Sequence, residues 1–255
     1  MQELTHLVER TLVIEAARPT VFRFFTDSAR WAAWWGAGSA IDAQPGGRVL
    51  IRYPNGVQVL GEVLEMVAPE RIVFTYGYES GKPIPPGASR VTIRLEEMEN
   101  GTRLHLTHAF AEAAVRDDHI RGWRFQLSVF ANLVANEINA GAPALVDAWF
   151  TAWSIGDAAE RMRSLEAIAA PEVRFHDRYA RIDGLAELDD HIAASLRFMP
   201  GVRLERSGAV RHCQHMLLVD WVMRGPDGAE RMSGVNVFVL DALGRIASVT
   251  GFWSQ

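Results

Sequence analysis

The feature that most constrains this sequence is a short interruption at residues 139–143, because a complete pattern of strands and helices lies on each side of it. The interruption reads Asn-Ala-Gly-Ala-Pro, and glycine and proline so close together disfavour continued regular structure. A chain of 255 residues is long enough for two domains of ordinary size. We therefore predict an α+β protein with two domains, residues 1–139 and 143–255, each with its own core.

The first segment has the pattern of an antiparallel sheet followed by one long helix. Strands are expected at residues 8–15, 48–53, 57–67, 71–78, 89–97 and 102–110. The alternation is clearest at Val91, Ile93 and Leu95. Between Ile120 and Ile138 apolar residues recur every three or four positions, which predicts a helix of about five turns with one apolar side. Because the inner face of the sheet is the large apolar surface available to that side, the pattern predicts a helix-grip fold.

Short motifs in a fixed order give this segment a family resemblance. The motifs are Trp31 to Trp35, Pro45-Gly46-Gly47-Arg48, Pro69-Glu70-Arg71, Gly101-Thr102-Arg103-Leu104, Thr107-His108 and Gly122-Trp123. With them, about residues 5–139 resemble the family of activator of heat-shock-protein-90 ATPase homologues, which belongs to the START-like superfamily. The resemblance implies a ligand-sized cavity between sheet and helix.

Four residues of the first segment are candidates for binding a ligand: Trp31, Trp35, His108 and Trp123. The tryptophans are also typical core aromatics. His108 shares a strand face with Leu106 and its apolar neighbours, so we expect it to point inward, as a hydrogen-bonded core histidine or as a ligand contact. Both interpretations stay open.

The second segment is predicted to place helices before a strongly bent sheet, which makes a cone. Helices are expected from about Leu145, at 158–169 and at 185–199, and strands at 172–177, 202–213, 215–224, 229–240 and 245–253. Gly225-Pro226-Asp227-Gly228 and Asp241-Ala242-Leu243-Gly244 are the expected hairpin turns.

Motifs in this segment carry a second resemblance. They are Gly156-Asp157, Ala170-Pro171-Glu172-Val173, Phe175-His176-Asp177, Gly225-Pro226-Asp227-Gly228 and Gly244-Arg245-Ile246. With them, residues 143–255 resemble the SnoaL-like group of the nuclear transport factor 2-like superfamily. That superfamily includes ketosteroid isomerases, polyketide cyclases, dehydratases and plain binding modules, so the resemblance implies a pocket without fixing its chemistry.

Asp177 is the candidate acid/base of the second pocket. It shares a strand face with Val173 and Phe175, so alternation points its carboxylate at an apolar interior, where it can act as a general base. Ketosteroid isomerases place their base aspartate where this sequence has Asp177, and their oxyanion donors align approximately with Trp149 and Asn236. An indole N–H and a carboxamide N–H can each donate to a developing oxyanion.

Three further interpretations belong to the same pocket. Phe175 and Phe238 are its candidate ligand-binding aromatics. Asp177 can instead cap a loop, satisfied by backbone N–H groups or by Arg178 or Arg181. We expect no cofactor and no metal, because the histidines in this segment do not form a ligand set of the usual spacing.

Charge and composition exclude several partners. The net charge is −5 and no segment has clustered basic residues, so we expect no nucleic-acid partner. No apolar stretch reaches the roughly 20 residues of a membrane helix, so we expect no membrane insertion. The single cysteine, Cys213, excludes an internal disulfide and is expected to be a small buried hydrophobe in a reducing compartment, which predicts a cytoplasmic protein.

The leading hypothesis is a protein whose two cavities bind a small hydrophobic organic molecule, with any catalysis being cofactor-free acid/base chemistry in the second domain. The rivals are a non-catalytic binding or regulatory module, and an interaction protein whose pockets are filled by the eight tryptophans. We also predict a homodimer through the C-terminal domain, on the argument that Leu217, Val219, Trp221 and Met223 form an apolar strand face that a partner covers.

Overall fold

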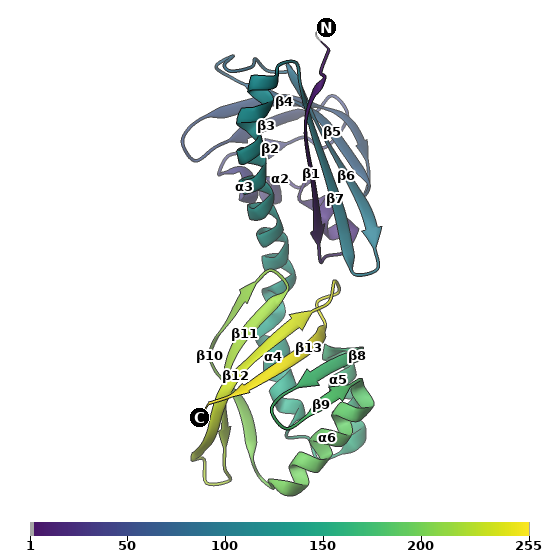
Figure 1. The fold of residues 1–255 in the computed structure, drawn as a ribbon, viewed down its shortest axis with the longest axis vertical. Coiled ribbons are helices and arrows are strands. Elements are labelled where there is room, and N and C mark those ends of the chain that lie inside the picture. The colour runs from purple at the N-terminus through teal and green to yellow at the C-terminus, as the bar shows by residue number, and fades with distance from the viewer. Residues whose placement is uncertain (1–2, 255) are drawn as a thin grey trace. The chain divides into compact units, whose positions relative to one another are not determined.

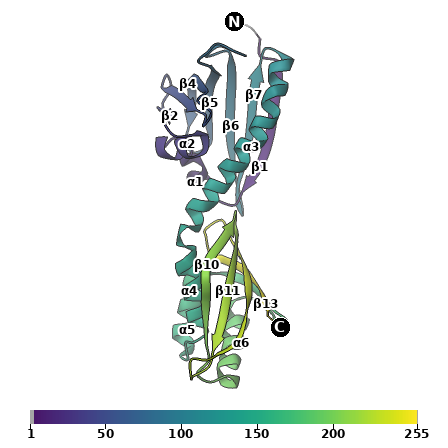
Figure 2. The ribbon, with the colours of Figure 1, turned by 90° about the vertical axis from the view of Figure 1, so that its left-hand side faces the viewer.

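The computed structural model describes residues 3–254, and the chain forms two compact units. The first ends at Val134 and the second begins at Ala135. Figure 1 shows a sheet with helices in each unit, and Figure 2 shows the same ribbon from a second side. The α+β class predicted from the sequence is confirmed.

The N-terminal unit is a seven-stranded antiparallel sheet with a long helix. Its strands are β1 (His6–Ile14), β2 (Ala40–Ile41), β3 (Arg48–Arg52), β4 (Gln58–Val67), β5 (Arg71–Tyr78), β6 (Ser89–Met98) and β7 (Gly101–Phe110). Their order in the sheet is β1-β7-β6-β5-β4-β3-β2. The helices are α1 (Arg18–Arg23), α2 (Ser28–Trp35) and α3 (Ala113–Ile138). The short β2 is a strand that the sequence pattern did not predict.

Helix α3 contacts the inner side of this sheet through its buried stripe. His119 packs against Phe110 of β7 with ring centroids 4.7 Å apart, and Trp123 packs against His108 at 5.8 Å. Phe130 stacks on Phe25, which precedes α2, at 4.9 Å. These contacts close the sheet into the helix-grip arrangement that the apolar period predicted.

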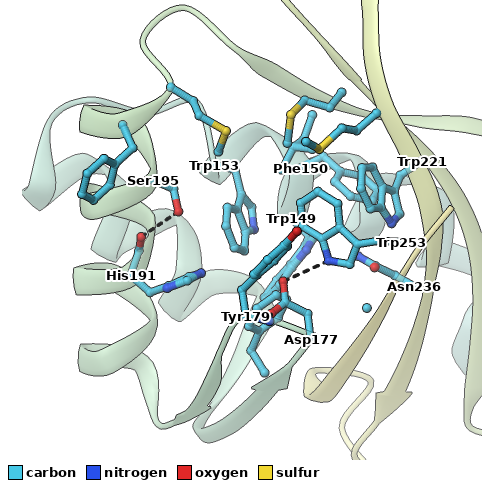
Figure 3. A pocket seen from close by; sticks show the side chains of 17 residues that line it. Trp149, Phe150, Trp153, Asp177, Tyr179, His191, Ser195, Trp221, Asn236 and Trp253 are labelled. Atoms are coloured by element: carbon cyan, nitrogen blue, oxygen red, sulfur yellow. Dashed lines mark hydrogen bonds between the residues drawn. The ribbon is translucent and has the colours of Figure 1, made fainter. Parts of the chain in front are cut away.

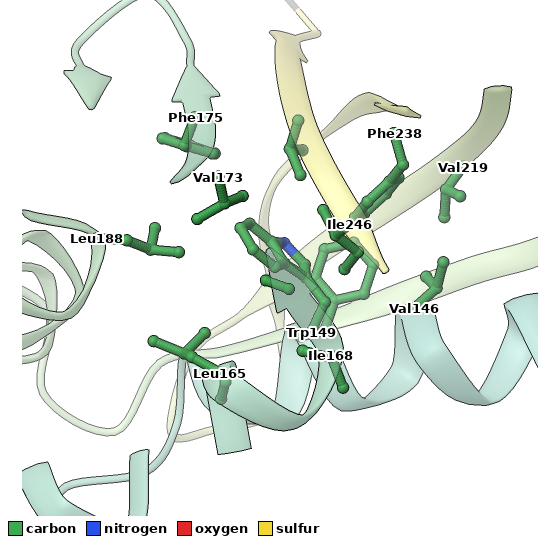
Figure 4. Close-up of a cluster of buried hydrophobic side chains, with 14 of the residues drawn as sticks. Val146, Trp149, Leu165, Ile168, Val173, Phe175, Leu188, Val219, Phe238 and Ile246 are labelled. Carbon is green, nitrogen blue, oxygen red and sulfur yellow. The ribbon is translucent and has the colours of Figure 1, made fainter. Parts of the chain in front are cut away.

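The C-terminal unit combines three helices with a six-stranded sheet. The helices are α4 (Ala142–Ala152), α5 (Ala158–Ile168) and α6 (Leu185–Phe198). The strands are β8 (Ala169–His176), β9 (Arg181–Asp183), β10 (Arg203–Cys213), β11 (Met216–Arg224), β12 (Glu230–Leu240) and β13 (Ile246–Trp253), in the order β10-β11-β12-β13-β8-β9. Strand β8 pairs in parallel with β13, and the sheet is otherwise antiparallel. Figure 4 shows the core that the helices bury against it.

The interruption at residues 139–143 is more regular than the sequence suggested. A 3-10 turn (Asn139–Gly141) follows α3 directly, and α4 begins at Ala142 with Pro143 in its first turn. Proline is tolerated there because the first N–H groups of a helix have no helical acceptor.

Two expectations about C-terminal side chains are wrong. The strand face made by Leu217, Val219, Trp221 and Met223 is buried inside the unit, with each side chain at most 4% exposed, so no partner is needed to cover it. The other face of β11 also carries apolar side chains, Leu218 and Val222, and alternation separates two faces without saying which is the inner one. Cys213, expected to be buried, is exposed at the end of β10.

Candidate functional site

A cavity of about 460 Å³ lies within the C-terminal unit, between α4, α6 and the sheet. That volume is within the range typical of small-molecule pockets. Large apolar side chains make most of the wall: Trp149, Trp153, Phe175, Trp221, Trp253, Met199 and Met223. Side chains with polar atoms also line it: Asp177, Tyr179, His191, Ser195 and Asn236. Figure 3 shows this wall, which the tryptophans form without filling the space.

Asp177 follows the last residue of β8 and opens the turn into β9. One carboxylate oxygen, Oδ1, accepts hydrogen bonds from the backbone N–H groups of Tyr179 and Ala180, both at 2.7 Å. The other, Oδ2, accepts one from Nε1 of Trp253 at 3.2 Å (Figure 3). The half-buried carboxylate therefore caps a loop through one oxygen and lines the cavity beside an indole with the other.

The side chains of Asn236 and Asp177 both lie next to Gly251. Asn236 on β12 pairs with Gly251 on β13. A Cβ atom at Gly251 would lie 3.2 Å from Oδ1 of Asn236 and 3.3 Å from Cβ of Asp177. The absence of a side chain at Gly251 thus lets the Asn236 amide oxygen and the Asp177 side chain lie on either side of this position. Two of the three proposed catalytic side chains are neighbours at the cavity wall.

The aromatic candidates divide between the cavity wall and the core. Trp149 of α4 lines the cavity and packs near Phe175, with ring centroids 6.1 Å apart. Phe175 also lines it. Phe238 is fully buried in the core, edge-on to Trp149 at 5.9 Å (Figure 4), and is not among the described residues that line this cavity. Phe238 shares a face with Asn236 but lies deeper, so it supports the wall from behind.

His191 is a polar cavity residue that the sequence analysis missed. It lies on α6, with ring centroids 5.7 Å from Trp153 and 5.9 Å from Phe175. Burial lowers its pKa below the usual value, while the nearby charge of Asp177 raises it in part. The helical spacing of Leu188, His191 and Ser195 is a signal that could have placed it on the inner face.

Two indoles of the wall keep buried N–H groups without an acceptor in the described structure: Nε1 of Trp153 and Nε1 of Trp221. The Trp221 ring lies over Gly234, where a Cβ atom would be 2.5 Å from Cζ2 of the indole. Gly234 is therefore required for this ring to occupy the wall. An unmet buried N–H is uncommon in native proteins and needs an explanation.

The N-terminal unit has its own cavity, of about 710 Å³, between α2, α3 and the sheet. Its wall is rich in aromatic residues: Trp34, Trp35, Tyr53, Tyr76, Tyr78 and Trp123. Trp35 and Trp123, both predicted to bind a ligand, line it and contact each other with ring centroids 5.6 Å apart. Trp31 is fully buried behind this wall, where Nε1 donates to the Leu50 carbonyl oxygen at 3.1 Å.

His108 lies in the core behind the same wall. Nε1 of Trp123 donates to its Nδ1 at 2.9 Å, so Nε2 carries the proton of the neutral ring and donates to Oγ of Ser89 at 2.8 Å. The Ser89 hydroxyl donates in turn to the Tyr76 carbonyl oxygen at 2.8 Å. Burial lowers the pKa of His108 well below its usual value, and His119 contributes to the same direction. This arrangement is that of a hydrogen-bonded core histidine.

Tyrosine hydroxyls and a second histidine belong to the polar lining of the N-terminal cavity, and the sequence analysis missed them. Tyr53 and Tyr76 share a hydrogen bond at 3.1 Å, and burial raises the pKa of Tyr53 to about 12. Nδ1 of His119 donates to the Val115 carbonyl oxygen at 2.7 Å, so its Nε2 accepts from the Tyr78 hydroxyl at 3.2 Å. The position of His119 one helical turn before Trp123 was the available signal.

Within residues 3–254, no group of three or more histidine, cysteine or acidic side chains could hold a metal ion. No described helix is both long and apolar enough to cross a membrane.

The folds and their cavities define a START-like helix-grip unit followed by a SnoaL-like cone. Residues 15–135 match the family model described as Activator of Hsp90 ATPase homolog 1-like protein, and residues 146–249 match the model of the SnoaL-like domain. Both resemblances expected from the sequence are confirmed. No curated protein matches this chain.

Solved structures resemble each half separately. A protein of the SnoaL-like family from Agrobacterium tumefaciens str. C58 is 24% identical, with 44% of this chain and 96% of that chain covered and a TM-score of 0.42. The Aha1 dimer from Colwellia psychrerythraea is 15% identical, covering 51% and 96%, with a TM-score of 0.45. CalU16 from Micromonospora echinospora is 25% identical, covering 52% and 76%, with a TM-score of 0.40. Similarity at this level does not determine what either half binds.

Proposed function

We propose that the C-terminal unit binds a small hydrophobic organic molecule and transfers a proton on it without a cofactor, with Asp177 as the acid/base. One observation carries the proposal: the carboxylate of Asp177 enters a cavity whose wall is otherwise mostly apolar. The turn N–H groups anchor Oδ1, which leaves Oδ2 beside the cavity to accept a proton from a bound C–H group. The SnoaL-like match supports an isomerase, cyclase or dehydratase type of reaction.

In this reaction the proton leaves a carbon of the substrate for Asp177, and its bonding electrons stay on the substrate as an enolate. The proton then returns from Asp177 to another carbon, so atoms and charge balance without an oxidant. Asn236, the neighbour of Asp177 above Gly251, donates to the enolate oxygen through its amide, and Trp149 forms the adjacent wall.

The second candidate function is a binding module without catalysis. Asp177 already accepts three hydrogen bonds, as a purely structural turn residue would. In that case the apolar wall is the functional part of the cavity and the carboxylate only shapes its edge.

Turnover of a nitro-substituted benzisoxazole separates the two functions, because a carboxylate that removes its C–H proton opens the ring to a coloured phenolate. Asp177→Asn should lower this rate by about 100-fold or more, the usual contribution of a general base. The amide oxygen of asparagine can still accept the two turn N–H bonds, so the fold is kept. Asp183→Asn, an exposed position on β9, is the matched control. Equal rates for Asp177→Asn and the wild type would leave the binding module as the function.

The N-terminal unit is proposed to bind a second hydrophobic molecule in its aromatic cavity, with Trp35 and Trp123 as wall residues. Its volume and its aromatic lining support this. The single cysteine supports a cytoplasmic location.

The chain is proposed to form a homodimer through the C-terminal unit. The reason given by the sequence, the face that contains Trp221, does not hold because that face is interior. The opposite side of the sheet instead exposes Leu218 and Phe252, at 36% and 57%. Val237 pairs with Leu218 on that side. This partly apolar surface supports the proposal.

A further inference from the structure

One of the four tryptophans of the N-terminal unit differs from the others in its indole N–H group. Three of the four donate to acceptors inside the unit, at 2.9 to 3.2 Å. The fourth, Trp35, is 3% exposed and lines the cavity of about 710 Å³, and its buried Nε1 has no acceptor among residues 3–254. A buried donor left unmet costs about 1–3 kcal/mol. Its place in a cavity wall points to an acceptor on the molecule that the cavity binds.

The side chains around Trp35 explain why the chain itself supplies no acceptor there. The rings packed on it, with centroids 4.2–5.8 Å away, are those of Trp31, Trp34, Tyr53 and Trp123. Three of these rings are indoles, which donate hydrogen bonds and do not accept them. Because neighbouring side chains cover Nε1, a bound molecule reaches it after a small rotation of one of these rings.

Phenolic oxygens are the hydrogen-bond acceptors of the same wall. The ring of Tyr53 is edge-on to Trp35 at 5.8 Å, and its hydroxyl shares one hydrogen bond with that of Tyr76, at 3.1 Å. A tyrosine hydroxyl has two lone pairs, so Tyr53 can accept a further hydrogen bond. A ligand group that serves both residues has to accept from Trp35 and donate to Tyr53. A hydroxyl group does both with a single oxygen atom.

The charges of the wall disfavour an anionic ligand. Asp118 is the charged residue among the described lining residues, and neither lysine nor arginine is among them. Burial lowers the pKa of His119, so its ring is neutral at neutral pH and offers no counter-charge. Burial also raises the pKa of Tyr53 to about 12, which means that negative charge is unfavourable at this part of the wall. The wall therefore suits a neutral molecule.

We infer that the ligand of the N-terminal cavity is a neutral aromatic compound whose hydroxyl group accepts a hydrogen bond from Trp35 and donates one to Tyr53. This inference rests on the binding function proposed for that cavity, and it gives the two wall tryptophans different roles. The indole N–H of Trp123 already donates to Nδ1 of His108, so Trp123 contributes packing alone. Trp35 contributes the donor that selects an oxygen atom on the ligand.

Three naphthalene compounds of similar size test the inference on the full chain. Naphthol carries a hydroxyl group, methoxynaphthalene accepts hydrogen bonds without donating, and ethylnaphthalene does neither. Each hydrogen bond should tighten binding by about three- to tenfold, so the Kd should rise in that order. The indole N–H resonances of Trp34 and Trp123, which line the same wall, measure binding at this cavity in NMR titrations. The indole proton of Trp35 should shift downfield with the naphthol and the ether, and not with ethylnaphthalene.

Two variants assign the two hydrogen bonds. Trp35→Phe should bind the ether and ethylnaphthalene equally, and Tyr53→Phe should bind naphthol no more tightly than the ether. Tyr179→Phe, the same kind of change in the C-terminal unit, is the control and should match the wild type.

The wild-type spectra decide the inference even where a variant does not fold. Equal affinities for the three compounds, or a Trp35 indole proton that does not shift downfield with the ether, would overturn it and leave the cavity as a general apolar site. If none of the compounds shifts the resonances of Trp34 and Trp123, the proposed binding function of the N-terminal unit fails together with the inference.

Discussion

Acidification should destabilise the N-terminal unit through His108. In the folded protein, burial holds the pKa of this histidine well below the usual value of 6.5, so the folded ring stays neutral while the unfolded one takes up a proton. The unfolded state therefore binds more protons below pH 6.5, and the free energy of unfolding falls as the pH falls. The contribution of the neutral His108 to the free energy of unfolding is fully present above pH 6.5.

The size of the effect follows from one proton. Between about pH 7.5 and about pH 5.5, His108 alone should remove about 1.4 kcal/mol from the free energy of unfolding. His119, whose pKa burial also lowers, adds to the same direction. Urea unfolding at several pH values measures the slope. In His108→Gln, the pH dependence of the free energy of unfolding should be smaller by the contribution of about one proton. The carboxamide can accept from Trp123 and donate to Ser89 without titrating.

His212→Gln, at an exposed position on β10, controls for the loss of a histidine. Parallel pH curves for the wild type and His108→Gln would refute the reasoning. If the variant does not fold, the NMR titration of the His108 ring in the wild type decides instead. A ring that titrates near pH 6.5 in the folded protein would contradict a buried neutral histidine.

Three further outcomes are expected. Gly234→Ala should lower the free energy of unfolding by about 1–3 kcal/mol in urea titrations, since the new methyl group meets the Phe252 carbonyl oxygen of the paired strand as well as the ring of Trp221; unchanged stability would contradict this crowding. Residues 1–140 and 142–255, expressed separately, should each give a cooperative unfolding transition, and insoluble halves would argue for one intertwined domain. Light scattering at tens of micromolar should report a dimer, and Phe252→Glu should yield monomers; a wild type that is monomeric there would reject the dimer.

Much of the fold could be predicted because local patterns carry it. In β6 the side chains of Val91, Ile93 and Leu95 are buried and their neighbours are not, as the alternation predicted. The same period placed Phe175 of β8, and Asp177 just after that strand, on the cavity side. Such alternation depends only on residues close together in the sequence, so it can be read without knowing how the chain packs.

Which residues line the cavity could be predicted less well. Whether a side chain reaches the cavity depends on its position along the strand and on how segments distant in sequence pack together. Alternation puts Asn236 and Phe238 on one face, yet the amide lines the cavity and the phenyl group is in the core. His191 lies on a helix with polar and apolar neighbours, and its meeting with Trp153 is set by how α6 packs, which no short pattern encodes.

The two carboxylate oxygens of Asp177 have different hydrogen-bond partners, and this restricts how the site can be altered. One oxygen accepts the two N–H groups of the turn from β8 to β9, and the other accepts from Trp253 at the cavity wall. Under the proposed function, a single side chain would therefore serve both the backbone and the chemistry. Lengthening it to glutamate would move the reactive oxygen and release the turn at once. Attempts to change the reaction or the substrate should therefore leave residue 177 alone and vary apolar wall residues such as Met199 and Met223.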